Sequence, residues 1–160
     1  MLRVRPYRRD DAKEVVKWCQ DERTFYFWSA GLFGDYPLTE EKLSFVEKFM
    51  PFVAFDDDKL VGFFNFRNVE DTLDELRIGF IILDPAQRAK GYAKQMIKLG
   101  LNFAFEVYGA NRVSLAVVAD NLSAYHCYKA IGFEEVDKEI SPLEVMGQSF
   151  SAKEMIIEKK

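Results

Sequence analysis

The stretch Ile78–Ala93, which reads IGFIILDPAQRAKGYA, decides how the rest of the chain can fold. Its apolar first half stops at Asp84-Pro85, which predicts a buried strand followed by a loop. The loop carries basic side chains and ends at Gly91, and from Ala93 apolar and small residues recur at helical spacing. A strand, a basic loop and a helix in this order predict unpaired backbone N–H groups at a helix N-terminus, where a phosphate group can bind.

The loop does not match two well-known phosphate-binding motifs. It lacks the Gly-Lys-Ser/Thr ending of a nucleotide-binding P-loop and the Gly-x-Gly-x-x-Gly of a dinucleotide fold. A strand–loop–helix junction also occurs in α/β proteins that bind nothing there, and a single glycine can simply relieve backbone strain. This stretch alone therefore leaves anion binding and an ordinary turn both open. The inner face of the helix is predicted to comprise Ala93, Met96, Ile97, Gly100, Ala104 and Val107.

A second informative stretch is Asn121–Phe133, which reads NLSAYHCYKAIGF. Its spacing predicts a short helix that Gly132 ends, with Tyr128 on the apolar face and His126 at the surface. Amphipathic helices commonly bury aromatic residues, so the spacing alone favours Tyr128 as a core residue. The predicted apolar face comprises Ala124, Cys127, Tyr128 and Ile131.

Together the two stretches resemble the GNAT acetyltransferase superfamily. Its cofactor signature, Arg/Gln-x-x-Gly-x-Gly/Ala, is matched by Arg88–Ala93, and its later pattern, Asn-x-x-Ala-x-x-x-Tyr-x-x-x-Gly-Phe, is matched by Asn121–Phe133. The clear resemblance covers residues 75–136. It implies an α/β fold in a single domain over residues 1–160. The sheet would be mixed and mostly antiparallel, with a splayed parallel pair at the cofactor cleft and helices on both faces.

The resemblance further implies that the chain is an N-acetyltransferase, which moves an acetyl group from acetyl-CoA to a primary amine by direct attack. The pyrophosphate would bind backbone N–H groups of the loop, and the pantetheine arm would run beside the strand before it. On local grounds Asn121 can equally cap a helix, and the basic side chains of the loop can be ordinary solvated charges. The implied cofactor-binding residues are Ile81, Ile82, Leu83, Gln87, Arg88, Ala89, Lys90, Gly91, Tyr92, Ala93 and Asn121.

Tyr128 is the first catalytic candidate that the resemblance implies, because a phenol within reach can protonate the departing thiolate. Backbone N–H groups near Ile81–Leu83 could meet the oxyanion. Many members of the superfamily place a glutamate base on the strand before the loop, but Arg77 stands at that position. Glu75 lies two residues earlier with the same strand parity, so it is the second candidate. A chain of water molecules, or an acceptor of lower pKa, would also serve.

Composition narrows the function further. The chain has 160 residues, of which 49% are hydrophobic. Its net charge of −4 argues against non-specific nucleic-acid binding. Two cysteines, Cys19 and Cys127, are expected as buried free thiols rather than a disulfide framework. One histidine and no Cys/His cluster predict no metal site. No apolar run is long enough to span a membrane, and no signal-peptide core is present, so a cytoplasmic location is expected.

The acceptor stays open between a protein N-terminus, a lysine and a small-molecule amine. Two other functions also stay open: a non-catalytic acyl-CoA-binding sensor or scaffold, and transfer of a different acyl group or to a hydroxyl. A homodimer is compatible with the resemblance, since dimers are common in the superfamily.

The rest of the chain predicts further strands and helices. Thr24–Pro37 is rich in aromatic residues and has no clear period, so it either packs on the core as a loop or broken helix, or forms an apolar wall over the acceptor site. Residues 141–151 are predicted to be a loop. One helix is expected to be capped by Asp10 or Asp11, and another to run from Thr39 to about Phe49 with Met50 on its inner side. The predicted strands are residues 2–6, 52–55, 60–67, 73–83, 112–118, 133–138 and 152–158, with 112–118 parallel to 73–83.

Overall fold

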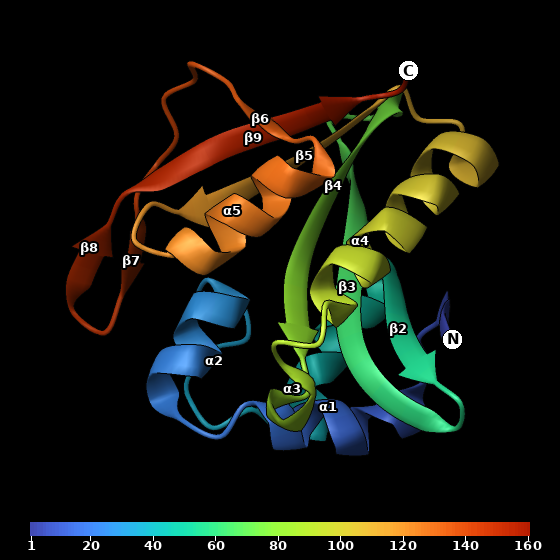
Figure 1. The fold of residues 1–160 in the computed structure, drawn as a ribbon. Coiled ribbons are helices and arrows are strands. Elements are labelled where there is room, and N and C mark those ends of the chain that lie inside the picture. The colour runs from blue at the N-terminus through green and yellow to red at the C-terminus, as the bar shows by residue number, and fades with distance from the viewer.

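The computed structural model describes all residues from 1 to 160 and contains one seven-stranded sheet (Figure 1). The strand order is β1-β2-β3-β4-β5-β9-β6, and only β4 and β5 run parallel. This confirms the predicted mixed, mostly antiparallel sheet. Its strands are β1 (Leu2–Pro6), β2 (Met50–Asp56), β3 (Lys59–Val69), β4 (Thr72–Leu83), β5 (Arg112–Val118), β6 (Glu134–Glu135) and β9 (Ala152–Glu158).

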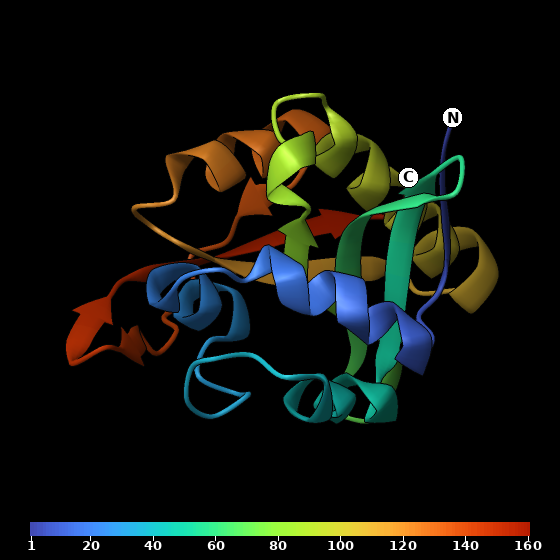
Figure 2. The ribbon, with the colours of Figure 1, turned by 90° about the horizontal axis from the view of Figure 1, so that it is seen from below.

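Helices cover both faces of the sheet (Figure 2). One face carries α1 (Ala12–Trp18), α2 (Glu22–Ser29) and α3 (Glu40–Leu43), and the other carries α4 (Tyr92–Asn102) and α5 (Leu122–Ile131). Each face has its own hydrophobic core. Met96 and Ile97 of α4 are buried on one side, and Phe25 and Trp28 of α2 are buried on the other. No helix is both long enough and apolar enough to cross a lipid bilayer.

The parallel pair is short. β4 and β5 are paired only where Glu75, Leu76 and Arg77 face Arg112, Val113 and Ser114. Beyond these residues the two strands diverge, although β4 continues to Leu83 and β5 to Val118 (Figure 1). The sheet therefore opens as a V between β4 and β5, and the backbone of the second half of β4 has no partner on the β5 side.

A β-bulge lies in the second half of β4, which the sequence did not predict. Asn65 and Phe63 are two residues apart on β3, but their partners Gly79 and Ile82 are three residues apart on β4. Phe80 takes up the extra residue with a left-handed φ of 51°. The bulge reverses the alternation of side chains, so Ile82 packs in the α1–α3 core although Ile78 packs in the α4 core.

The predicted helix after Gly91 forms, but its last turn differs from the prediction. α4 continues into a π-helical segment, Phe103–Tyr108, which ends at Gly109 with φ 89°. A π-helical turn has more residues than an α-helical turn, so the inner face shifts. The prediction that Val107 faces the core is therefore wrong: this residue is 71% exposed.

Four further predictions need correction. Residues 141–151 are not a loop throughout but contain a hairpin of β7 (Leu143–Val145) and β8 (Gln148–Phe150). Met50 begins β2 rather than lying on a helix, because the helix after Thr39 ends in a 3-10 segment, Ser44–Lys48. The strand expected over 133–138 is only β6. Asp11 does not cap α1 with its side chain, which is instead paired with Arg5 at 2.8 Å.

Candidate active site

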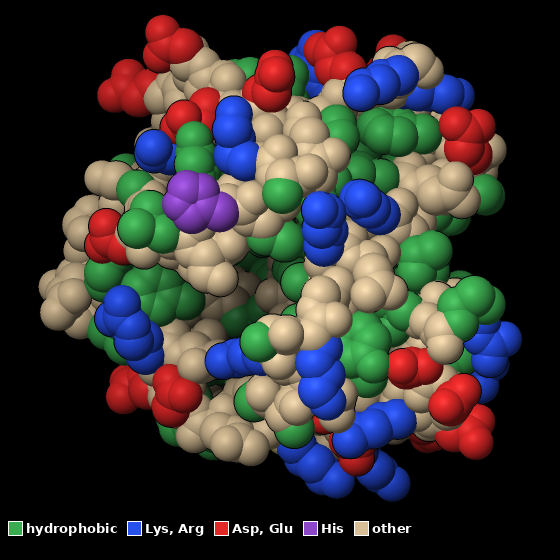
Figure 3. All heavy atoms as spheres, viewed as in Figure 1, with side chains coloured by type: hydrophobic (Ala, Val, Ile, Leu, Met, Phe, Trp, Pro, Cys, Tyr) green, Lys and Arg blue, Asp and Glu red, His purple; other side chains and the backbone are tan.

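The V between β4 and β5 lies under a hollow in the molecular surface. Figure 3 shows this hollow below the single histidine, His126, which α5 carries. In the same view of the ribbon, α5 and α2 lie on two sides of it and β4 on the third (Figure 1). Lysine and arginine side chains stand along the rim. The cleft therefore combines an unpaired strand edge with a positively charged entrance.

The N-terminus of α4 is open to solvent at this entrance. Its cap is Gly91, with φ 78°, and no side chain bonds its first N–H groups. By contrast, Asp21, Thr39 and Asn121 cap α2, α3 and α5 with their side chains. Ala89, with φ 63°, adds a second left-handed residue to the preceding loop. The loop can thus present backbone N–H groups and the positive end of the helix dipole to an anion.

The side chains of the loop do not all point into the cleft. Gln87 is buried, and its Oε1 accepts a hydrogen bond from Lys90 Nζ at 3.0 Å. The Tyr92 hydroxyl donates to Asp56, the last residue of β2, at 2.7 Å. Arg88 is exposed. Hydrogen bonds from Thr24 are the main cause that lowers the pKa of the Asp21 carboxyl, and the charge of Arg88 lowers it further. Arg88 is therefore the loop side chain that stays available to a ligand.

Helix α5 brings the second predicted stretch to the same cleft. Asn121 Oδ1 accepts from the backbone N–H of Ala124 at 3.3 Å, so the side chain caps the helix. Tyr128 is half-buried against the α4 core, with its ring 6.0 Å from that of Phe133. Burial, and secondarily the neighbouring Cys127 thiol, raise the pKa of the Tyr128 phenol above its usual range. The hydroxyl is thus held in its protonated form.

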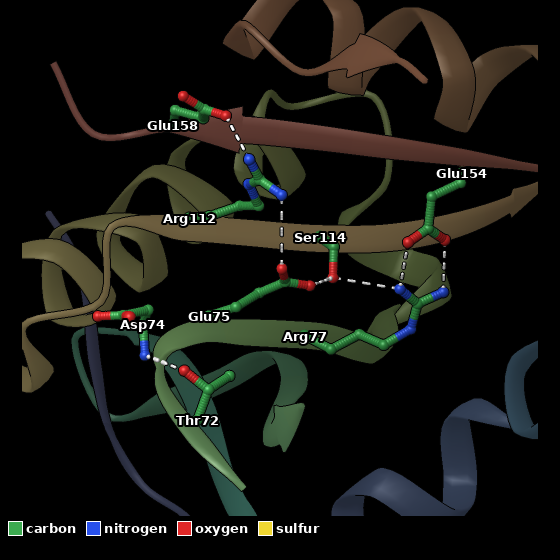
Figure 4. A network of polar contacts seen from close by, with 8 residues as sticks. All are labelled: Thr72, Asp74, Glu75, Arg77, Arg112, Ser114, Glu154 and Glu158. Carbon is green, nitrogen blue, oxygen red and sulfur yellow. Dashed lines mark hydrogen bonds and ion pairs between the residues drawn. The ribbon is translucent and has the colours of Figure 1, made fainter. Parts of the chain in front are cut away.

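Glu75 and Arg77 point to the same face of the sheet, as their parity predicted, and belong to one polar network (Figure 4). Arg77 forms a bidentate ion pair with Glu154 of β9, with both N–O distances 2.8 Å. Ser114 on β5 accepts from Arg77 at 3.1 Å and donates to Glu75 at 2.8 Å. Arg112 lies 3.9 Å from Glu75 and 2.7 Å from Glu158. Glu75 is therefore held where the strands are still paired, at the closed end of the V.

Three residues of this region were not identified from the sequence: Ser114, Glu154 and Asn65. Glu154 is 4% exposed and Asn65 is 2% exposed. The Oδ1 atom of Asn65 is buried without a hydrogen-bond partner, which ordinarily costs about 1–3 kcal/mol. The sequence signal that could have identified these residues is a polar side chain at a core-facing position of a predicted strand. A polar group buried in this way needs a hydrogen-bond partner.

The aromatic segment forms a short helix and a wall beside the bulge. The centroid of the Phe80 ring lies 5.9 Å from the ring centroid of Trp28 and 5.0 Å from that of Phe33. The Phe27 ring of α2 packs against the Phe150 ring of the β7–β8 hairpin, with 4.8 Å between the ring centroids. Trp28 and Phe33 are buried in the core, while Phe27 is only half-buried. The segment therefore packs on the core and also supplies apolar surface next to the cleft.

The chain is similar in sequence to several known proteins. The sequence matches the Acetyltransferase (GNAT) family over residues 12–133. A mycothiol acetyltransferase from Corynebacterium efficiens is 31% identical over 143 residues, which are 87% of this chain and 46% of that protein. A spermidine N(1)-acetyltransferase from Vibrio cholerae is 29% identical over 77 residues, 48% of this chain and 44% of that protein. The chain spans about half the length of these relatives.

A solved structure supports the fold. The crystal structure of spermidine N-acetyltransferase from Vibrio cholerae, in complex with CoA and spermine, superimposes with a TM-score of 0.81 at 21% identity. The superposition covers 98% of this chain and 95% of the other. The family match covers most of the chain, and the sheet contains the single parallel pair that the resemblance implied. The chain belongs to the acetyltransferase (GNAT) family.

Proposed function

We propose that this protein transfers the acetyl group of acetyl-CoA to a primary amine. The observation that carries the proposal is the V between β4 and β5, with an uncapped helix N-terminus at its entrance. The N–H groups of residues 88–93 would bind the pyrophosphate, and Arg88 would add charge. The unpaired edge of Ile81–Leu83 would pair with the amides of the pantetheine arm in the manner of an added strand.

Catalysis would use direct attack of the amine on the thioester. The bulge at Phe80 leaves backbone groups outside the ladder, so an N–H near Ile81 could stabilise the oxyanion. Tyr128 would donate its proton to the departing thiolate. Glu75 stays a candidate base, although it already accepts from Ser114 and would act through water from the closed end of the V.

A non-catalytic acyl-CoA sensor is the second candidate, and Arg77 in place of the usual glutamate is the observation that favours it. The relatives named above are acetyltransferases, which favours the enzyme. We also infer a cytoplasmic location, because the two cysteines are free thiols and suit a reducing compartment.

The deciding experiment is calorimetric titration with acetyl-CoA followed by thiol release across a panel of amines. Binding with turnover would support the proposal. Binding without turnover on any amine would favour the sensor, and no binding would mean that the loop is only a strand–loop–helix turn.

Replacing Gly91 with valine should weaken acetyl-CoA binding at least about tenfold. A Cβ at this position meets only Gln95 Nε2 at 3.8 Å, so the free protein has room for it. The side chain would instead stand between the backbone and the pyrophosphate, and it would strain the left-handed φ. Titration calorimetry of the purified variant measures the effect.

Gly109→Val is the matched control, because Gly109 also has a left-handed φ and no crowding at the other end of the same helical segment. The Gly109→Val variant should lose about as much stability as the Gly91 variant and keep the native affinity for acetyl-CoA. Equal affinity of the Gly91 variant and the native protein would rule out the phosphate loop.

A further inference from the structure

Asn65 is a polar residue in the middle of β3 whose carboxamide oxygen is not used by the folded chain. Its neighbours Phe64 and Phe66 pack beneath Gly100 of α4, so Asn65 points to the opposite face, toward α1–α3. Buried acceptors without a donor are uncommon in native proteins. The oxygen is therefore available to a donor that the folded chain itself does not supply.

Open space lies over the residue that pairs with Asn65, while the oxygen itself is covered in the free protein. The cross-strand partner of Asn65 is Gly79 on β4, and paired residues share a face. A Cβ built on Gly79 would have nothing within 4 Å. Phe80 begins the bulge immediately after it, and the pairing of β4 with β5 has already ended at Arg77. Gly79 thus forms the floor of a space that borders the V.

Arg67 supplies an unbalanced positive charge at the other end of this space. It lies two residues beyond Asn65 on the same face, across from Arg77. The ion pairs of the cluster join Arg77 to Glu154, and Arg112 to Glu75 and Glu158, which leaves Arg67 without a carboxylate of its own. Arg67 is exposed, yet partial desolvation first, and repulsion by Arg77 second, lower its pKa, while Glu154 opposes the shift. A bound anion would relieve this repulsion.

We propose that Asn65 and Arg67 recognise the acceptor together, and that the acceptor is an amine that also carries a carboxylate, such as an amino acid or a short peptide. The amine lies above Gly79 and donates to Asn65 Oδ1 once that side chain turns toward the open space, and the carboxylate pairs with Arg67. Side chains two residues apart on a strand emerge about 6.6 Å apart, which a small amino acid and two converging side chains can bridge. A polyamine carries only positive charge and meets Arg67 with like charge. The inference rests on the proposed acetyl transfer.

The substrate class is tested by thiol release from acetyl-CoA with the twenty common amino acids, their C-terminal amides and spermidine. The best amino acid should exceed its own amide and spermidine in kcat/KM by about tenfold or more. Arg67→Ala should raise KM for that amino acid about tenfold, with kcat within about twofold, and should leave the amide unaffected. Lys98→Ala removes an exposed positive charge from α4 on the opposite face and should change neither.

The position of the site is tested by Gly79→Val and Asn65→Leu. Valine at Gly79 has room and suits a strand, so the melting temperature should not fall, while turnover should be largely lost and the Kd for acetyl-CoA retained. Leucine at Asn65 removes an unpaired polar group, so the melting temperature should again not fall, while KM for the amino acid should rise. A purely structural Asn65 would instead lower the melting temperature and leave KM unchanged.

Several outcomes overturn the inference. Amides or spermidine used as well as the amino acids would contradict it while leaving the proposed acetyl transfer intact. An Arg67→Ala variant that still prefers the amino acid over its amide would also contradict the inference. So would a protein that binds acetyl-CoA but acetylates none of these amines. Failure to bind acetyl-CoA at all would instead show that the proposed function is wrong.

Discussion

Replacing Tyr128 with phenylalanine is expected to lower kcat for acetyl transfer by about a hundredfold and to leave the Kd for acetyl-CoA unchanged. The hydroxyl is the only group removed, and burial keeps it protonated because it raises the pKa of the phenol. The same shift makes full proton transfer to the thiolate less favourable, so the expected factor is near the low end for general acid catalysis. Steady-state thiol release and calorimetry separate the two quantities.

Tyr125→Phe is the matched control on the same helix. The Tyr125 hydroxyl donates to the exposed Glu135 at 3.0 Å and lies outside the proposed chemistry, so this variant should keep native turnover. A raised pKa also predicts that the rate does not fall with pH on account of Tyr128 below the ordinary phenol range of about 10. Full activity of Tyr128→Phe would remove this residue from the mechanism.

Replacing Arg77 with alanine should lower the free energy of unfolding by about 3–5 kcal/mol. Glu154 is 4% exposed and forms both of its short ion-pair contacts with Arg77, so the variant leaves an uncompensated buried carboxylate. Urea unfolding of the native protein and the variant at neutral pH measures this loss.

The double variant Arg77→Met/Glu154→Leu serves as the control for this prediction. It replaces both partners with apolar side chains of similar size and should recover most of the lost stability. If Arg77→Ala alone is as stable as the native protein, the ion pair does not hold β4 to β9, and the network at the closed end of the V does not stabilise the fold.

The sequence predicted the framework of the site because that framework depends on local patterns. The periods of the stretches that became β4, β5 and α5, and the glycine before α4, each reflect residues that are close in the chain. Predicted strands 73–83, 112–118 and 152–158 agree with β4, β5 and β9 to within one residue. The placement of the loop and Tyr128 at one site came from the family resemblance and not from these local patterns.

The chemistry of the acceptor side could not be predicted in the same way. Arg77 and Glu154 are 77 residues apart in the sequence, and their pairing depends on β9 lying between β5 and β6. The hairpin β7–β8 was also missed, because its strands are too short to show a clear alternation.

By itself, the sequence predicted the strands, the loop that ends at Gly91 and the helix that carries Tyr128, because each depends on residues that are close in the chain. The mixed sheet was implied by the family resemblance, since it depends on pairing between distant segments. Only the tertiary structure decided the bulge at Phe80, the depth of the V, and the unpaired Asn65 beside the open floor of Gly79. These features depend on the register between strands, and register is set by packing across the whole sheet rather than by any one stretch of the chain.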